Sequence, residues 1–343
     1  MIDYIDFVCK NNNHKLLFDD YACYDEYISH DVYKQTICNK FVLYWNKNVL
    51  EFGKTLQECF SNKYIKLGEQ KKTIAHIKFS GTSFENYHMK NGVYEPGIFD
   101  ISKILSNDVE QIQNIKIIEC DKCYIMKLVK LPPNLIKLDC SNNNIANLDG
   151  LPHTLKILNC SKNKIKEVSN LPHNLEVLIC SENTNINLDY LPESLIWLDC
   201  SACKICNLEN LPSGLKILVC INNCLEKLNS LPHSLEILSC QHNIITSIDG
   251  ELPHNLIQLH CGFNKLEKIG RLPDKLEVLA TQSNFLTNIG KLPPNLLVLE
   301  CNSNRLTEIG EIPQNLHHLG ISHNLIKNIN EIIIPPSVKY FRK

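Results

Sequence analysis

The amino-acid sequence predicts a solenoid built from short parallel strands, in which one turn of the chain takes about twenty residues. The first observation is a phrase that begins at Leu131-Pro132 and returns with small changes as far as Ile334-Pro335. The second is a fixed spacing of apolar residues inside that phrase. The third is the length of the unit, which leaves too few residues for a return helix after a strand and its turn. The predicted fold is therefore mainly β.

The repeats are counted from the Leu-Pro pair that opens each unit, and Ile replaces Leu in the last two. One residue is inserted before Leu252 and two before Ile334. A fainter copy, without the opening pair, precedes the first unit around Ile118 and Cys120. The units begin at Leu131, Leu151, Leu171, Leu191, Leu211, Leu231, Leu252, Leu272, Leu292, Ile312 and Ile334.

Within a unit the fixed positions spell L-x-x-L-x-C-x-x-N-x-I-x-x-L, as in Leu135, Leu138, Cys140, Asn143 and Ile145. This pattern resembles the leucine-rich repeat, in which a short strand is followed by an Asn or Cys turn. The unit length and the opening Leu-Pro are most similar to the short repeats of secreted bacterial effectors. The resemblance implies a solenoid with parallel strands on its concave face. Frequent Asn, Ile and Lys also suggest an AT-rich genome, such as that of a large DNA virus of amoebae.

The alternation of side chains along a strand predicts that Leu138 and Cys140 point inward, while residues 137, 139 and 141 point outward. The opening Leu-Pro pair favours extended or polyproline geometry, so we expect an extended or 3₁₀ convex side. A buried amide at the strand-to-turn corner can satisfy backbone groups that an apolar residue cannot. We assign this structural role to the recurring Asn: Asn143, Asn163, Asn183, Asn223, Asn243, Asn264, Asn284, Asn304 and Asn324.

Residues 1–108 lack the repeat phase, and we expect them to form an N-terminal α+β cap, with the solenoid spanning 109–343. A cap would cover the apolar face of the first coil. The alternative is a recruiting domain that docks a second partner. A helix that starts at Asp31 and runs through Phe41 and Tyr44 and a hairpin over residues 41–52 fit the sequence equally, and Ile74–Phe79 has the spacing of a degenerate first strand.

Composition limits the partners. The net charge is −2, charged residues make up 21% of the chain, and no basic run is present, so we expect no nucleic-acid partner. Two Asp residues near the N-terminus argue against a signal peptide, and every apolar run is too short for a membrane helix. The odd count of seventeen cysteines also favours a reducing compartment. We expect a soluble, cytoplasmic monomer, in the host cytoplasm if the source is viral.

Several cysteines and histidines are candidate metal ligands. Cys200 and Cys203 have C-x-x-C spacing, and Cys206, Cys220 and Cys224 lie near them. The repeat itself explains most of this spacing, so we expect free thiols and no metal, although Cys206 and Cys224 stay unexplained. Four histidines fall on connecting segments, where solvated side chains are expected: His153, His173, His233 and His254. No P-loop, dinucleotide fingerprint or hydrolase motif occurs, so neither a cofactor nor catalytic residues are predicted.

The outward strand positions carry the functional prediction. An apolar stripe centred on Trp197 has the composition of a protein-binding patch, although shading by neighbouring coils could equally explain it. The predicted partner-binding residues are Trp197, Val177, Ile217, Ile237, Ile179, Val219 and Asp199. We expect a non-catalytic protein-protein interaction module that binds on the concave face. The alternative is an adaptor or ubiquitin-ligase-associated protein whose N-terminal region recruits machinery, as the resemblance to effectors allows.

Overall fold

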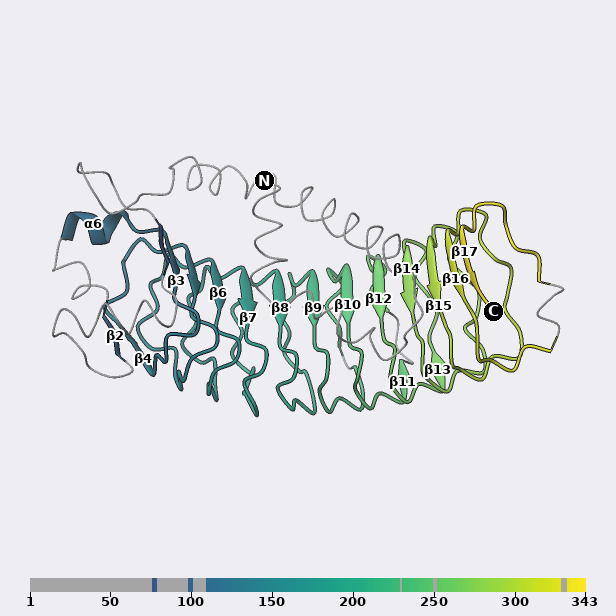
Figure 1. The fold of residues 1–343 in the computed structure, drawn as a ribbon, viewed down its shortest axis with the longest axis horizontal. Coiled ribbons are helices and arrows are strands. Elements are labelled where there is room, and N and C mark those ends of the chain that lie inside the picture. Colours follow the sequence, from purple (N-terminus) through teal and green to yellow (C-terminus); the bar gives the residue numbers. More distant parts are fainter. Residues whose placement is uncertain (1–75, 79–97, 101–108, 229, 249–251, 328–331) are drawn as a thin grey trace. The chain divides into compact units, whose positions relative to one another are not determined.

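The computed structural model describes residues 76–78, 98–100, 109–228, 230–248, 252–327 and 332–343. The chain divides into two compact units, Met1–Lys72 and Thr73–Lys343. All described residues belong to the second unit, whose strands stand side by side (Figure 1). The predicted cap or recruiting region 1–108 lies outside the described residues, apart from two short strands at 76–78 and 98–100.

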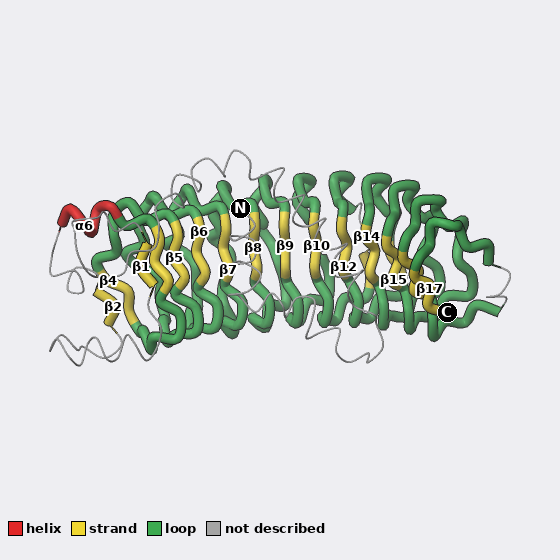
Figure 2. The backbone as a smooth tube through the Cα atoms, turned by 45° about the horizontal axis from the view of Figure 1, so that its top comes forward, coloured by secondary structure: helices red, strands yellow, loops and turns green. Residues whose placement is uncertain are grey.

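A thirteen-stranded parallel sheet runs the length of the second unit (Figures 1 and 2). Each strand is three residues long, and neighbours in the sheet come from successive coils. The strands, in spatial order, are β1 (His76–Lys78), β3 (Ile117–Glu119), β5 (Lys137–Asp139), β6 (Ile157–Asn159), β7 (Val177–Ile179), β8 (Trp197–Asp199), β9 (Ile217–Val219), β10 (Ile237–Ser239), β12 (Gln258–His260), β14 (Val278–Ala280), β15 (Val298–Glu300), β16 (His318–Gly320) and β17 (Tyr340–Arg342).

The strand register follows the repeat. Leu138 pairs with Leu158 one coil on, and the inserted residue before Leu252 is absorbed outside the strands, because Leu238 still pairs with Leu259. At the start of the sheet Ile77 pairs with Ile118, so the predicted degenerate strand is confirmed. The parallel solenoid predicted from the period is likewise confirmed.

The sides of the coils away from the main sheet are largely turns and extended segments. A two-stranded pair joins β2 (Ile98–Asp100) to β4 (Lys127–Val129), and another joins β11 (Ser247–Ile248) to β13 (Lys268–Ile269). These pairs agree with the extended alternative for the convex side. One helix, α6 (Val109–Asn114), precedes the first regular coil and was not predicted.

A short turn lies directly before the strand of each coil. Leu135 N donates to Pro132 O over 3.2 Å, and the same bond recurs at Leu155, Leu175 and Leu195 over 3.0 Å. The proline fixes φ at the start of this turn and has no N–H that would need a partner. The leucine that closes the turn is fully buried in each of these coils. The Leu-Pro opening therefore sets the angle at which the chain enters the core.

One continuous core fills the interior of the coils. It consists of the inward leucines, the cysteines that follow most of the strands and the Ile or Leu that follows each corner. Leu138, Cys140 and Ile145 are all completely buried. Burial raises the pKa of the Cys140 thiol well above its usual value, so these cysteines stay protonated and serve as small apolar side chains.

The corner asparagine ties two coils together. The Asn223 Nδ2 group donates to Cys220 O of its own coil and to Cys200 O of the preceding coil, over 3.1 and 3.0 Å. Its Oδ1 accepts from the backbone N–H groups of Cys203 and Ile205, both over 3.0 Å. Donation to two coils recurs at every member of the row from Asn143 to Asn324. The side chain supplies bonds that the turning backbone cannot make for itself.

The coil that has Cys203 at this corner solves the same problem differently. The Cys203 thiol donates to Cys180 O over 3.4 Å, as the asparagine amide would, but it offers no comparable acceptor. Asn185 N instead donates to the backbone oxygen of Cys203 over 2.7 Å. Lys204, the next residue, has a positive φ of 59°. The backbone thus bends to replace the missing amide oxygen.

We expect Asn223→Ala to lower the free energy of unfolding by about 1–3 kcal/mol, because it leaves buried backbone groups of two coils without partners. Urea denaturation followed by circular dichroism measures the change. The matched control is Asn174→Ala, whose amide is exposed and makes one long bond to His153 O. An Asn223→Ala midpoint equal to that of the control would show that the corner amide contributes little.

Candidate functional site: the strand face

The strand face is the outward surface of the main sheet and consists of two rows of side chains. Over the strands from β3 to β17 of this sheet, the first row comes from the first residue of each strand and the second row from the third. The first row holds Ile117, Lys137, Ile157, Val177, Trp197, Ile217, Ile237, Gln258, Val278, Val298, His318 and Tyr340. The second row holds Glu119, Asp139, Asn159, Ile179, Asp199, Val219, Ser239, His260, Ala280, Glu300, Gly320 and Arg342.

The central strands bring the predicted partner-binding residues together. Trp197 lies in register between Val177 and Ile217, and Asp199 lies between Ile179 and Val219. Ile237 continues the first row on β10. Strands about 4.8 Å apart place these side chains directly beside one another. The apolar stripe is thus continuous across β6 to β10.

The stripe is buried but separate from the core of the coils. Trp197 and Ile217 are each 3% exposed, and Val177 is 6% exposed. None of the apolar side chains on the strand face from β6 to β10 belongs to the core cluster, which is formed by inward positions. The molecule therefore has a second apolar layer, on the side of the sheet away from the core.

Asp199 is the one charged residue in the apolar centre, and Ser201, which follows the strand, fixes its side chain. Its Oδ1 accepts from Ser201 N over 3.0 Å and from Ser201 Oγ over 2.8 Å. Asn159 and Ser161 repeat this arrangement two coils earlier. Each bond satisfies a carboxylate or amide oxygen that the apolar neighbours cannot. The side chain therefore has a fixed direction.

A buried ion pair lies toward the N-terminal end of the strand face. Lys137 Nζ and Glu119 Oε1 are 3.2 Å apart, and both side chains are less than 10% exposed. Burial raises the pKa of Asp139 in the next row, while hydrogen bonds from Ser141 and the charge of Lys137 oppose the rise. Opposite charges at such low exposure stabilise each other because water does not screen them.

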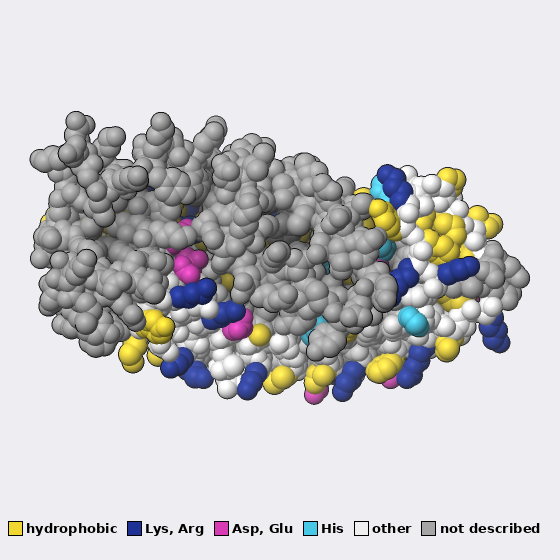
Figure 3. Space-filling view, viewed as in Figure 1, with side chains coloured by type: hydrophobic (Ala, Val, Ile, Leu, Met, Phe, Trp, Pro, Cys, Tyr) yellow, Lys and Arg dark blue, Asp and Glu magenta, His cyan; other side chains and the backbone are white. Residues whose placement is uncertain are grey.

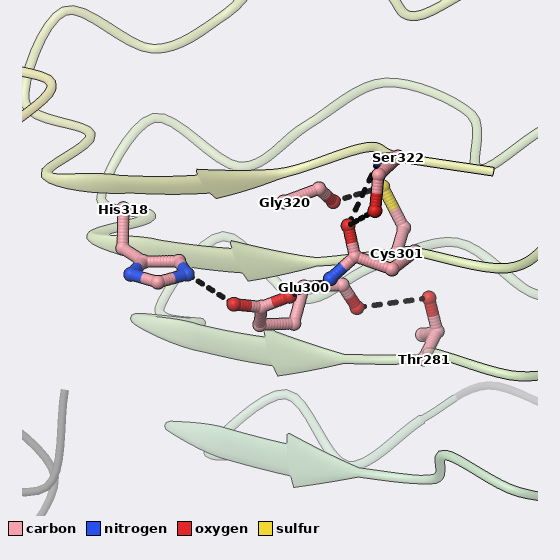
Figure 4. Close-up of polar contacts among 7 residues, drawn as sticks. Thr281, Glu300, Cys301, His318, Gly320 and Ser322 are labelled. Carbon is pink, nitrogen blue, oxygen red and sulfur yellow. Dashed lines mark hydrogen bonds and ion pairs between the residues drawn. The ribbon is translucent and has the colours of Figure 1, made fainter. Parts of the chain in front are cut away.

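A second polar group marks the C-terminal end, where His318 on β16 points at the Glu300 carboxylate on β15 (Figure 4). Asn302 Nδ2 also donates to Glu300, and Asn302 Oδ1 accepts from Ser322 N and Oγ, both over 2.9 Å. Gly320 leaves room for this cluster, because a Cβ there would collide with the Glu300 carboxylate. The glycine in the second row is thus explained by its neighbour.

Between the apolar centre and this end lies a neutral histidine. His260 is 2% exposed, and burial lowers its pKa from 6.5 to about 4. Its ring contacts the Gln258 amide oxygen over 3.4 Å on the same strand. The strand face is therefore apolar in the middle, neutral and polar at His260, and charged at both ends.

Sequence reasoning identified the apolar stripe but not the polar ends. The missed residues are Glu119, Lys137, His260, Glu300 and His318. A signal did exist, because a glutamate and a lysine or histidine occupy diagonal positions of adjacent coils in the two rows. Lys137 follows Glu119 by 18 residues, and His318 follows Glu300 by the same interval.

The other candidates lie apart from the strand face. His153, His173, His233 and His254 are exposed on connecting segments, and the His233 and His254 rings are 6.1 Å apart. Cys200, Cys203 and Cys220 are buried, whereas Cys206 and Cys224 are exposed. Within the described ranges, no group of three or more His, Cys, Asp or Glu side chains is placed to hold a metal ion.

The outer surface shows no dominant charge among the described residues. Basic side chains stand singly between apolar and uncharged ones along the lower border of Figure 3. Several pair across coils, as Lys156 does with Glu176 over 2.8 Å. Such partly exposed pairs contribute at most about 1 kcal/mol each. None of the helices in the described part has the length and apolarity needed to cross a membrane.

Comparison with known proteins identifies the architecture. The family described as Leucine Rich repeats (2 copies) matches residues 133–173. The fold is a leucine-rich-repeat solenoid. A structure of YopM, a leucine-rich effector protein from Yersinia pestis, matches at 28% identity with a TM-score of 0.55, covering 67% of this chain and 77% of that one.

Two further solved structures extend the comparison. YopM from Yersinia enterocolitica is 29% identical with a TM-score of 0.45, and the match covers 67% of this chain and 64% of that one, just under two thirds. The functional domain of InlJ from Listeria monocytogenes, which includes a cysteine ladder, is 24% identical with a TM-score of 0.51, covering 63% and 55%. No curated protein matches the sequence.

We expect stability to fall as the pH decreases through the range set by His260. The unfolded chain binds the proton near pH 6.5, whereas the native histidine stays neutral until about pH 4. Since one pKa unit corresponds to about 1.4 kcal/mol, this residue alone should cost the wild-type protein on the order of 3 kcal/mol across the interval. Below about pH 4 its contribution should stay constant.

His260→Gln should remove this part of the pH dependence, as measured by urea denaturation between pH 7 and pH 4. The control is His173→Gln, because that histidine is exposed. Identical pH profiles for wild-type protein and His260→Gln would contradict a neutral, buried His260.

Proposed function

We propose that this protein is a non-catalytic protein-protein interaction module and that its strand face binds the partner. The observation that carries the proposal is the continuous apolar row centred on Trp197, which lies outside the core cluster of the coils. A solenoid needs its inward rows to close each coil, but it does not need aromatic and aliphatic residues on the opposite side of the sheet. Their presence there favours a role in recognition.

The central residues have the composition of a binding hot spot. Hot spots are enriched in tryptophan and surrounded by less important contacts that exclude water. Trp197 has Val177 and Ile217 on either side in its row, and the fixed carboxylate of Asp199 is next to it on the same strand. We infer that the tryptophan supplies most of the apolar contact and that Asp199 orients a donor of the partner.

The polar ends would set direction and selectivity. Charged groups at the border of an interface discriminate between partners and fix their register more than they add affinity. The Glu119–Lys137 pair and the Glu300–His318 pair lie on opposite sides of the apolar centre. A partner segment that runs along the row would meet one pair at each end.

Low exposure adds a kinetic expectation. Because Trp197 is 3% exposed, contact with a partner would require a rearrangement around this side chain. Binding that requires a conformational change is slower than docking of preformed surfaces, which proceeds at about 10⁵–10⁷ M⁻¹s⁻¹. We therefore expect association at or below the lower end of that range.

The likeness to an effector supports a partner inside a cell. The Yersinia pestis structure is that of an effector protein, and its match has both the identity and the TM-score to carry this comparison. The thirteen cysteines in the described part of the chain are free, which fits a reducing compartment. We propose a host protein as the partner if the source is viral or bacterial.

Trp197→Ala should weaken binding by roughly 30-fold or more, since truncation of a central aromatic typically costs at least about 2 kcal/mol. The partner would be captured with the full chain from its native cell, and its Kd would then be measured by calorimetry with purified components. Far-ultraviolet circular dichroism would establish that the variant is folded.

Tyr190→Ala is the matched control, because this aromatic residue is 68% exposed and lies outside the main sheet. It should leave the Kd unchanged. The proposal fails if Trp197→Ala binds as wild type does while its Tm drops by several degrees. That result would assign Trp197 to packing between coils.

A further inference from the structure

Two surface thiols on adjacent coils form the remaining cluster of reactive groups. Of the thirteen described cysteines, eleven are buried and two, Cys206 and Cys224, are exposed. The repeat demands cysteine only at the inward end of the strand, where the side chain fills the core. The repeat does not explain these two thiols.

Their positions in the unit are ordinarily filled by other residue types. Each flanks the buried Ile or Leu that follows the corner: Cys206 comes after Ile205, and Cys224 comes before Leu225. The residues after that Ile or Leu in other coils include Ala146, Lys166, Glu226, Thr246, Glu267, Thr287 and Thr307, and the residues before it include Asn144, Lys164, Lys204, Ile244, Lys265, Phe285 and Arg305. Cysteine occurs once in each series, and the two occurrences fall in consecutive coils.

The backbone brings these two residues together. Cys224 N donates to Ile205 O over 2.8 Å, which places residue 224 opposite the peptide that joins residues 205 and 206. Backbones bonded in this way lie about 4.8 Å apart, and a disulfide requires Cα atoms about 4.4–6.8 Å apart. The Cys206 Sγ atom approaches Lys204 O at 3.8 Å, and Lys204 holds the position equivalent to Cys224 in the preceding coil. The Cys206 thiol thus points along its own coil toward Lys204, next to which Cys224 lies in the following coil.

The core cysteines differ from this pair in both access and geometry. Cys200 and Cys220 hold equivalent positions in successive coils, so their Cβ atoms point the same way, which is poor geometry for a disulfide. Burial also raises the pKa of each of these thiols well above its usual value, so the reactive thiolate is scarce. Cys206 and Cys224 are diagonal neighbours on the outer surface and are open to a reagent.

We propose that Cys206 and Cys224 form a thiol-disulfide exchange site that is oxidised by low-molecular-weight disulfides of the glutathione class. One protein thiolate attacks a sulfur of the oxidant, forms a mixed disulfide and releases one thiol. The second protein thiolate attacks the protein sulfur of that mixed disulfide, closes the Cys206–Cys224 bond and releases the other thiol. Two protein thiols are oxidised, one disulfide is reduced to two thiols, and the two protons pass to the departing thiolates.

The test uses the full chain, oxidised glutathione and peptide mapping after alkylation of the remaining thiols. Trypsin cleaves after Lys204, Lys216 and Lys227, so Cys206 lies in peptide 205–216, while Cys224 lies in 217–227 together with the buried Cys220. We expect the two peptides to be linked through Cys206 and Cys224, with the loss of two hydrogens. Cys220 should remain free, and a dithiol reductant should separate the peptides.

Single variants decide whether the two thiols act together. Cys224→Ser should retain one glutathione on peptide 205–216, and Cys206→Ser should retain one on peptide 217–227, because neither variant can resolve the mixed disulfide. Both substitutions are at exposed positions and leave the core unchanged. A wild-type protein whose two peptides stay unlinked, whether both, one or neither carries glutathione, would overturn the proposal.

Discussion

The side-chain amide at the corner of each coil is the interaction on which the rest of the structure depends. A chain that turns after a three-residue strand leaves backbone N–H and C=O groups inside the molecule with no partner in the sheet. Asn143 answers this with five bonds, three donated and two accepted, that reach the backbone of its own coil and the preceding one. Because these bonds join each coil to the preceding one, the stability of a coil should depend on that of its neighbours.

This corner requires an unfavourable backbone conformation in every coil. The residue before the corner position has a positive φ between 53° and 57° all along the array, including Ala202 and the bulky Phe263. For a residue with a side chain this region costs about 1–2 kcal/mol. Phe263 recovers part of that cost by stacking on His242, with ring centroids 4.4 Å apart. The amide bonds and the buried core must outweigh the strain, since otherwise the chain would place glycine there.

The fold could be predicted from the sequence because each physical requirement recurs in about ten units. Leu138, Cys140 and Asn143 could be assigned from spacing alone, since strand alternation and the corner leave each position a single role. Features without a repeated pattern could not be predicted in this way. The helix α6 has no periodic signal. The polar pairs on the strand face were missed because they depend on which residues meet across coils, which the unit pattern does not encode.

The residues of the strand face are stacked at the same spacing as the core residues, but they do not have to fill the interior of a coil. Stacking at about 4.8 Å makes every outward residue a neighbour of its equivalents, so like residues merge into a stripe and opposite charges become pairs. The stripe from Ile157 to Ile237 and the pairs at Glu119 and Glu300 are two outcomes of this one rule. Changing a single outward residue leaves the inward rows that close each coil unchanged. A solenoid of this kind can therefore keep its core fixed while its strand face is adapted to a partner.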